Sequence, residues 1–82
     1  MNTFKHIIQD PLGMHARPAG LLARTAATFQ SDIQLTAKGK TVNAKSIMSL
    51  MMLGLKSGDE MQFQLNGTDE VQAAEAIRAI LP

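Results

Sequence analysis

The sequence predicts an α+β fold in which helices cover one face of a mainly antiparallel sheet. Segments with the two-residue period of strands alternate with segments of helical spacing, in the order β-α-β-β-α-β-α. A tight turn over 38–40 joins two of the predicted strands into a hairpin. Of the 82 residues, 45% are hydrophobic, which is enough for one small globular domain spanning residues 1–82.

The first half of the chain predicts a strand, a long helix and a hairpin. Isoleucines favour a strand over 4–8, and Asp10-Pro11 with Gly13 marks a loop over 9–14. A helix is expected over about 16–29, because Pro18 is tolerated only in a first turn. The hairpin strands follow over 33–37 and 41–44. The expected buried face of the helix consists of Ala19, Leu22, Ala26 and Phe29.

The second half predicts a short helix, a strand and a final helix. Ser46 is a natural N-cap for a helix over 47–53, and Gly54 would end it. Apolar and polar residues alternate over 60–65, as in a half-buried strand. Thr68 or Asp69 would then cap a helix over 70–80. Its expected apolar face consists of Val71, Ala74, Ile77 and Leu81.

Composition excludes several classes of protein. The chain has no Trp, no Tyr and only three Phe, and its net charge is +1, so neither base stacking nor phosphate-backbone binding to nucleic acid is expected. It contains no Cys, which removes disulfides and thiol chemistry. The first ten residues lack the apolar core of a signal peptide, and no apolar stretch is long enough to span a membrane. We therefore expect a cytoplasmic protein without membrane insertion.

The segment Gly13-Met14-His15-Ala16-Arg17-Pro18 carries the strongest chemical signal. A neutral imidazole is a nucleophile near pH 7, and His15 directly precedes the predicted helix. A helix N-terminus offers unpaired N–H groups, here those of Ala16 and Arg17, to a phosphate. An arginine guanidinium, such as that of Arg17, can bind phosphate oxygens in a bidentate manner. The segment predicts a histidine that carries a phosphoryl group; the alternative is a loop histidine beside a solvated arginine.

The other parts of an enzyme are missing around His15. There is no Walker loop and no carboxylate pair for Mg²⁺. Asp10, five residues away, is weak evidence for an orienting acid. A metal site shared with His6 is disfavoured, and His6 is expected on the surface of the first strand. We therefore expect a stoichiometric carrier without metal or cofactor, which receives its phosphoryl group from one protein and gives it to another.

A second segment, over 43–53, is rich in methionine. A short helix cannot bury every side, so Met48 and Met51 are expected to reach the surface as an adaptable protein-binding patch. The alternative is that these methionines fill gaps in the core. Ser46 has two interpretations as well: an N-cap alone, or a phosphorylation site whose added charge would act beside an interface without melting the helix.

Both segments resemble motifs of one protein family. Gly13-Met14-His15-Ala16-Arg17-Pro18-Ala19 resembles the active-site motif of the HPr family, the histidine phosphocarriers of the bacterial phosphoenolpyruvate-dependent sugar phosphotransferase system. Asn43-Ala44-Lys45-Ser46-Ile47-Met48 resembles its regulatory-serine motif. The resemblance implies an open-faced β-sandwich, with four antiparallel strands and three helices on one face. It also implies that Nδ1 of His15 accepts phosphate from phosphorylated enzyme I and passes it to IIA domains of sugar permeases, with Arg17 stabilising the phosphate.

The same resemblance implies a docking face, a regulatory site and a monomer. Phosphorylation of Ser46 by an HPr kinase/phosphorylase would create a form that binds a catabolite control repressor. The run over 49–53 is also similar to the nitrogen-branch paralogue, so a regulatory carrier that acts mainly through protein binding stays open. The docking face would comprise Gly20, Leu21, Arg24, Ile47, Met48 and Met51.

Overall fold

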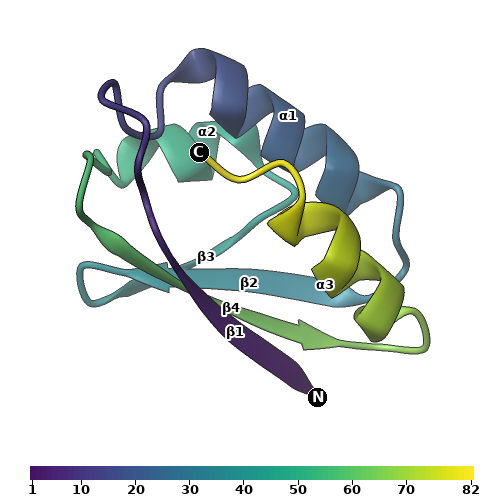
Figure 1. The fold of residues 1–82 in the computed structure, drawn as a ribbon. Coiled ribbons are helices and arrows are strands. Elements are labelled where there is room, and N and C mark those ends of the chain that lie inside the picture. The colour runs from purple at the N-terminus through teal and green to yellow at the C-terminus, as the bar shows by residue number, and fades with distance from the viewer.

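Four strands form one antiparallel sheet, and three helices lie on one of its faces (Figure 1). The computed structural model describes residues 1–82. The strands have the spatial order β1-β4-β2-β3, which confirms the open-faced arrangement of four strands and three helices. The elements are β1 (Asn2–Ile7), α1 (Ala16–Ala27), β2 (Asp32–Ala37), β3 (Lys40–Asn43), α2 (Ile47–Met52), β4 (Glu60–Asn66) and α3 (Glu70–Arg78).

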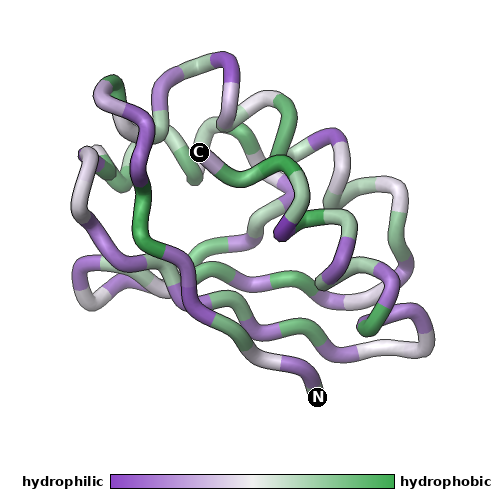
Figure 2. The backbone as a smooth tube through the Cα atoms, viewed as in Figure 1, coloured by the Kyte–Doolittle hydropathy of each residue, from purple (hydrophilic) through white to green (hydrophobic).

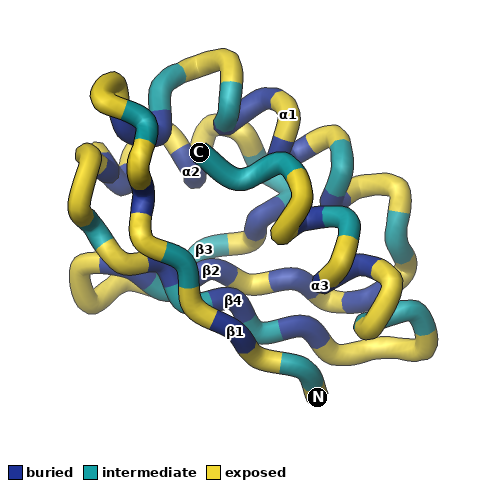
Figure 3. Tube along the Cα trace, viewed as in Figure 1, coloured by how far each residue is buried: buried dark blue, intermediate teal, exposed yellow.

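Strand β4 lies at the centre of the sheet and determines which side chains face the helices. It pairs with both β1 and β2, and Phe63 has Phe4 on one side and Leu35 on the other. These three residues are buried, whereas Gln62 and Gln64 alternate toward the opposite, polar face. The alternation in hydropathy and burial is visible along the strands in Figures 2 and 3. One face of the sheet is therefore the floor of the core, and the other is open.

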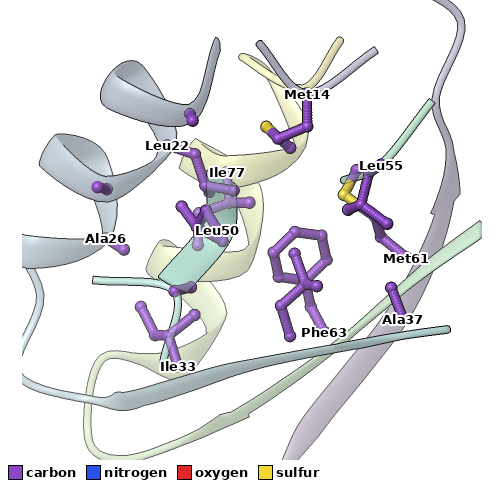
Figure 4. Packing of buried hydrophobic residues seen from close by; sticks show 14 of the residues in the cluster. Met14, Leu22, Ala26, Ile33, Ala37, Leu50, Leu55, Met61, Phe63 and Ile77 are labelled. Atoms are coloured by element: carbon purple, nitrogen blue, oxygen red, sulfur yellow. The ribbon is translucent and has the colours of Figure 1, made fainter. Parts of the chain in front are cut away.

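The core is a single cluster of 20 buried hydrophobic residues between the sheet and the helices. Leu22 of α1, Leu50 of α2 and Ile77 of α3 point into the space above the sheet, where Phe63 projects from β4 (Figure 4). The Phe63 ring stacks on that of Phe4, with ring centroids 4.9 Å apart. Because each helix contributes a fully buried side chain, the core fixes all three helices on the sheet.

The helix starts follow the local signals in the sequence. Helices α1, α2 and α3 begin at Ala16, Ile47 and Glu70 as predicted, and each ends one or two residues earlier than predicted. The Ser49 N–H donates to Ser46 Oγ at 3.3 Å, which confirms the N-cap of α2. The strands lie within two residues of their predicted bounds. Short polar caps and turns in the sequence therefore determine where the helices and strands begin and end.

Two side chains point in directions that differ from the prediction. Val71 is 55% exposed, because the first turn of α3 directs Ala73 and Ala74 toward the sheet instead. His6 is half-buried, since it shares the helix-facing side of β1 with Phe4. Its Nε2 is enclosed without a hydrogen-bond partner, so the predicted surface position of His6 is wrong.

Asp69 connects the start of α3 to the segment between α1 and β2. It occupies the N-cap position of α3, but its side chain makes no capping bond there. It instead accepts the hydroxyl of Ser31, the N–H of Gln30 at 2.9 Å and the N–H of Ser31 at 3.0 Å. The Ser31 hydroxyl, followed by the Gln30 N–H, holds the pKa of Asp69 below its ordinary value. The ionised form of Asp69 therefore stabilises this corner of the fold.

Asp69 is expected to make the protein sensitive to acid. Because its pKa is lower in the folded state, its contribution is fully present above the unfolded value of about 3.9 and is lost as pH falls through the folded value. We expect Asp69→Asn to lower Tm by several degrees near pH 7, and much less below about pH 3. Thermal melts followed by circular dichroism measure both differences. Asp32→Asn, at an exposed position, is the control, and an equal effect of Asp69→Asn at both pH values would contradict the argument.

Candidate functional site

His15 lies at the junction of the β1–α1 loop and helix α1. It occupies the N-cap position, with an extended backbone (φ −82°, ψ −175°). The loop before it is held by backbone bonds: the Gly13 N–H donates to the Asp10 carbonyl at 2.9 Å, and the Met14 N–H donates to the Leu55 carbonyl at 3.0 Å. Gly13 has a φ of +69°, a conformation that L side chains rarely adopt. The position of His15 thus depends on a tight turn docked against the segment that precedes β4.

The start of α1 carries unpaired backbone donors next to His15. The first bond of the helix is donated by the Ala19 N–H to the His15 carbonyl at 3.0 Å. Pro18 has no N–H, and no acceptor in the chain takes the N–H of Ala16 or Arg17. These two donors and the positive end of the helix dipole favour an anion beside the imidazole. The expected phosphate-facing backbone groups are therefore free.

Asp10 determines which nitrogen of His15 carries a proton. Its Oδ2 lies 3.3 Å from Nε2 of His15, and its Oδ1 accepts the Leu12 N–H at 2.9 Å. The Leu12 N–H, and to a lesser degree His15, hold the pKa of Asp10 below its ordinary value. An ionised carboxylate only accepts hydrogen bonds, so Nε2 must be the protonated nitrogen. Nδ1 of the neutral ring then holds the lone pair that a nucleophile requires.

His15 opens into a shallow depression that combines apolar walls with cationic groups. Its lining includes the side chains of Arg17, Leu21 and Arg24 from α1. Pro82 also lines it, and the Pro82 carbonyl accepts the N–H groups of Gln9 and Asp10, both at 2.9 Å. Two guanidinium groups and two free N–H groups lie in or beside the depression, together with the carboxylate of Asp10. The depression therefore suits a group with two negative charges better than a neutral one.

An apolar surface adjoins this depression on α1 and α2. The predicted residues Leu21, Ile47, Met48 and Met51 are exposed, as is the Arg24 side chain. Gly20 differs from the prediction: it is buried, and a Cβ there would lie 3.3 Å from Nη1 of Arg24 and 3.4 Å from Cδ1 of Ile47. Its role is to let α2 and the Arg24 side chain approach α1 closely.

Three residues of this region were not assigned from the sequence. Leu12 and Met52 are large apolar side chains with high exposure next to the predicted surface. Leu12 lies in a polar loop and gave no signal of exposure, whereas Met52 lies four residues after Met48, so the side of the helix that exposes Met48 also exposes Met52. For Asp10 the sequence gives only its separation of five residues from His15, which does not show whether its carboxylate points toward the imidazole. In each case the backbone of the loop or the rotation of the helix decides the outcome.

Ser46 lies at the start of the helix that carries the methionines. Its hydroxyl caps α2, and the side chain is half-buried. The neighbouring Lys45 Nζ donates to the Phe29 carbonyl at 2.9 Å, which links this corner to the segment after α1. A charge added at Ser46 would lie at the positive end of α2, one turn from Ser49.

The fold and the site together define a class of protein. A small α+β domain presents an imidazole with a free Nδ1 at a helix N-terminus, in a depression that two arginines also line and beside an apolar surface. It contains no Walker loop to bind a nucleotide as phosphoryl donor. These features are those of a small histidine phosphocarrier. No helix of the protein is long and apolar enough to cross a membrane.

Comparison with known proteins identifies the family. The family model described as "PTS HPr component phosphorylation site" matches residues 2–82. The phosphocarrier protein HPr of Mycoplasma genitalium is 44% identical over 82 residues, which cover 99% of this chain and 93% of that protein. The HPr structure from Thermoanaerobacter tengcongensis has a TM-score of 0.94 at 38% identity, covering 99% of this chain and 91% of the other. A Mycoplasma histidine-containing phosphocarrier gives the same TM-score at 43% identity, covering 96% and 90%.

The chain therefore belongs to the HPr family, the phosphocarriers of the phosphotransferase system. Two independent features of the sequence pointed to this family: the histidine segment before α1 and the serine segment before α2.

Proposed function

We propose that Nδ1 of His15 accepts a phosphoryl group from phosphorylated enzyme I and donates it to IIA domains of sugar permeases. The observation that carries this proposal is the contact between Nε2 of His15 and the Asp10 carboxylate, at 3.3 Å. In the first step the Nδ1 lone pair attacks phosphorus, and the donor's P–N bond breaks with its electron pair returning to the donor imidazole. The second step repeats this displacement, with His15 as donor.

Charge stabilisation would come from the helix start and the arginines. The transferred group brings a charge of about −1.5 to −2. Ala16 and Arg17, which supply the free N–H groups and a guanidinium, line the same depression as His15. Phosphoryl transfer needs mainly positioning and electrostatic stabilisation, which these preorganised donors supply. All of these groups lie in one copy of the chain, so we propose that the protein acts as a monomer. We also propose that it acts in the cytoplasm.

The test of this proposal is phosphorylation with phosphoenolpyruvate and a catalytic amount of enzyme I. We expect one acid-labile phosphate per chain, transferable to a IIA domain. With ¹⁵N-labelled histidine, the phosphorylation shift in the NMR spectrum should appear at Nδ1 of His15. Phosphate on Nε2, on His6, or in an acid-stable linkage would contradict the proposal.

Asp10 is expected to act as a positioning residue for this transfer. An asparagine at position 10 can donate an N–H to Nε2, which would favour the tautomer in which Nδ1 is blocked. We expect Asp10→Asn to slow phosphorylation by enzyme I about tenfold, by analogy with outer partners of other functional histidines. The ¹⁵N shifts of the unphosphorylated ring report the tautomer directly. Asp59→Asn is the control, because Asp59 also accepts a loop N–H, from Lys56 at 2.8 Å, but does not contact His15. If Asp10→Asn keeps both rate and tautomer, this role is wrong.

We also propose that Ser46 is a regulatory phosphorylation site. Its hydroxyl begins the helix that carries Ile47, Met48 and Met51 on its surface. The helix N-terminus would stabilise a phosphate there, and the phosphate would add charge at the edge of the apolar docking face. An HPr kinase/phosphorylase would be the modifying enzyme, and a catabolite control repressor a partner of the product. A regulatory carrier that binds such partners without supplying sugar permeases is the alternative, favoured by the exposed methionines next to Ser46.

Ser46→Asp is expected to weaken enzyme I docking about tenfold while leaving the helix content unchanged. The physical reason is desolvation of a carboxylate placed at the edge of an apolar interface. The KM for phosphorylation measures the docking, and circular dichroism measures the fold. Thr3→Asp adds the same charge on the open face of the sheet and serves as the control. An unchanged KM for Ser46→Asp would eliminate the charge-based mechanism.

A further inference from the structure

The sulfur atoms of this protein divide into two groups by exposure. The chain has six Met and no Cys, so all of its sulfur is in thioethers. Met14 and Met61 are 5% and 0% exposed, and both belong to the core. Met48, Met51 and Met52 are 75%, 46% and 82% exposed. Oxidation of methionine follows solvent access, so the two groups differ in reactivity.

The exposed group lies on the surface proposed above for docking. All three residues lie in α2, within two turns of one another. The adjoining Ile47 comes within 3.4 Å of the position that a Cβ at Gly20 would take, so the methionine surface continues onto α1 next to Leu21 and Arg24. Apart from Met1 at the N-terminus, no other part of the chain exposes a thioether sulfur. Apart from Met1, the exposed sulfur of the domain is therefore concentrated on α2, which packs against the helix whose start holds His15.

We propose that Met48, Met51 and Met52 form a site of reversible oxidation by hydroperoxides, and that oxidation weakens the docking of phosphoryl donors and acceptors. The inference rests on the proposed function, because it assigns a control to the same docking face. In the reaction the thioether sulfur attacks the terminal oxygen of the hydroperoxide. The S–O bond forms and the O–O bond breaks. When the oxidant is hydrogen peroxide, its remaining oxygen leaves as water. Sulfur is oxidised by two electrons and the peroxide is reduced by two.

The physical effect follows from the polarity of a sulfoxide. A thioether is apolar and adaptable, whereas a sulfoxide carries a strong hydrogen-bond acceptor that must lose its water when a partner covers it. The fold should survive, because α2 is anchored by Leu50, which is fully buried and contains no sulfur. We expect a loss of affinity of about tenfold for enzyme I, without unfolding.

The first experiment locates the oxidation. The folded protein is treated with hydrogen peroxide, digested with trypsin and analysed by mass spectrometry. Cleavage after Lys45 and Lys56 places the three exposed methionines in one peptide, while Met14 and Met61 fall in others. We expect the 46–56 peptide to gain up to three oxygen atoms while the peptides of Met14 and Met61 stay unmodified. Oxidation of Met14 or Met61 at the same rate would overturn the proposal.

The second experiment measures the consequence for phosphoryl transfer. With oxidised protein, we expect the KM for enzyme I to rise about tenfold at nearly constant kcat, and methionine sulfoxide reductases to reverse the change. The triple variant Met48→Leu, Met51→Leu, Met52→Leu is compared with itself before and after peroxide, and it should keep its own starting KM. An unchanged KM in the oxidised protein, or an equal rise in the triple variant, would show the proposal to be wrong. If the untreated protein takes no phosphate from enzyme I, the proposed function fails, whereas the mass analysis still reports the oxidation site.

Discussion

Replacing His15 with alanine is expected to abolish the incorporation of acid-labile phosphate from phosphoenolpyruvate and enzyme I. Only His15 combines an accessible ring with the free N–H groups of Ala16 and Arg17. The other histidine, His6, cannot substitute, because its Nε2 is enclosed and it lies within a strand, far from any helix start. The loss should therefore be complete, not partial. Phosphate incorporation is measured as acid-labile label per chain under saturating enzyme I.

The control for this prediction is His6→Gln, which removes the second imidazole and leaves the site intact. It should retain one acid-labile phosphate per chain. The fold of His15→Ala is checked by its thermal melt, which should stay close to that of the parent because the His15 side chain is only partly buried and caps no backbone group. Label on the His15→Ala protein would disprove the assignment of His15 as acceptor.

Gly13→Ala is expected to have the largest effect on stability and to slow phosphoryl transfer as well. A Cβ at this position would lie 2.8 Å from Cα of Lys56 and closer still to the Leu55 carbonyl oxygen. The φ of +69° adds a conformational cost of about 1–2 kcal/mol for any L side chain. The clash involves backbone atoms, which cannot rotate away, and adds about 1–3 kcal/mol. A total of about 3 kcal/mol would lower Tm by more than about 10 °C in a domain of this size.

The same substitution should disturb the site through the backbone. Relief of the clash requires the loop to move away from Leu55, which breaks the bond from the Met14 N–H and shifts the adjacent His15. A displacement of about 1 Å can cost a factor of about 100 in rate. Gly39→Ala is the matched control: its φ is +75°, and nothing lies within 4 Å of the added Cβ. It should lose the conformational part of the stability alone, about 1–2 kcal/mol, with no change in transfer rate. Equal losses in the two variants would contradict the proposed clash.

The fold of this protein was predictable because its boundaries depend on short-range chemistry. Pro18 in a first turn and Ser46 as N-cap mark the starts of two helices, and the alternation of Met61 and Phe63 with polar residues marks the central strand. Each of these signals acts within a few residues. Val71 was placed wrongly because the rotation of a short helix depends on the sheet beneath it, and α3 has several apolar faces to choose from.

The site was only partly predictable. His15 and Arg17 could be identified because their chemistry is local to the helix start. The role of Asp10 depends on a turn that returns the carboxylate to the imidazole, and the Gly13 φ that permits this turn is fixed by docking against Leu55. The burial of Gly20 likewise depends on how closely two helices approach. Such features arise from contacts between distant segments, which the spacing of residues does not encode.

The central position of β4 has a consequence for how the protein folds. Its partner β1 comes from the opposite end of the chain, with Asn2 opposite Leu65, and β2 pairs with the same strand. No antiparallel ladder wider than the β2–β3 hairpin can form before β4, which begins at Glu60, has started to leave the ribosome. Pairings between such remote segments are slow to find, because a long loop must close before any contact stabilises it. Helix α1 and His15 thus emerge early, but the sheet beneath them is completed only after β4 has been synthesised.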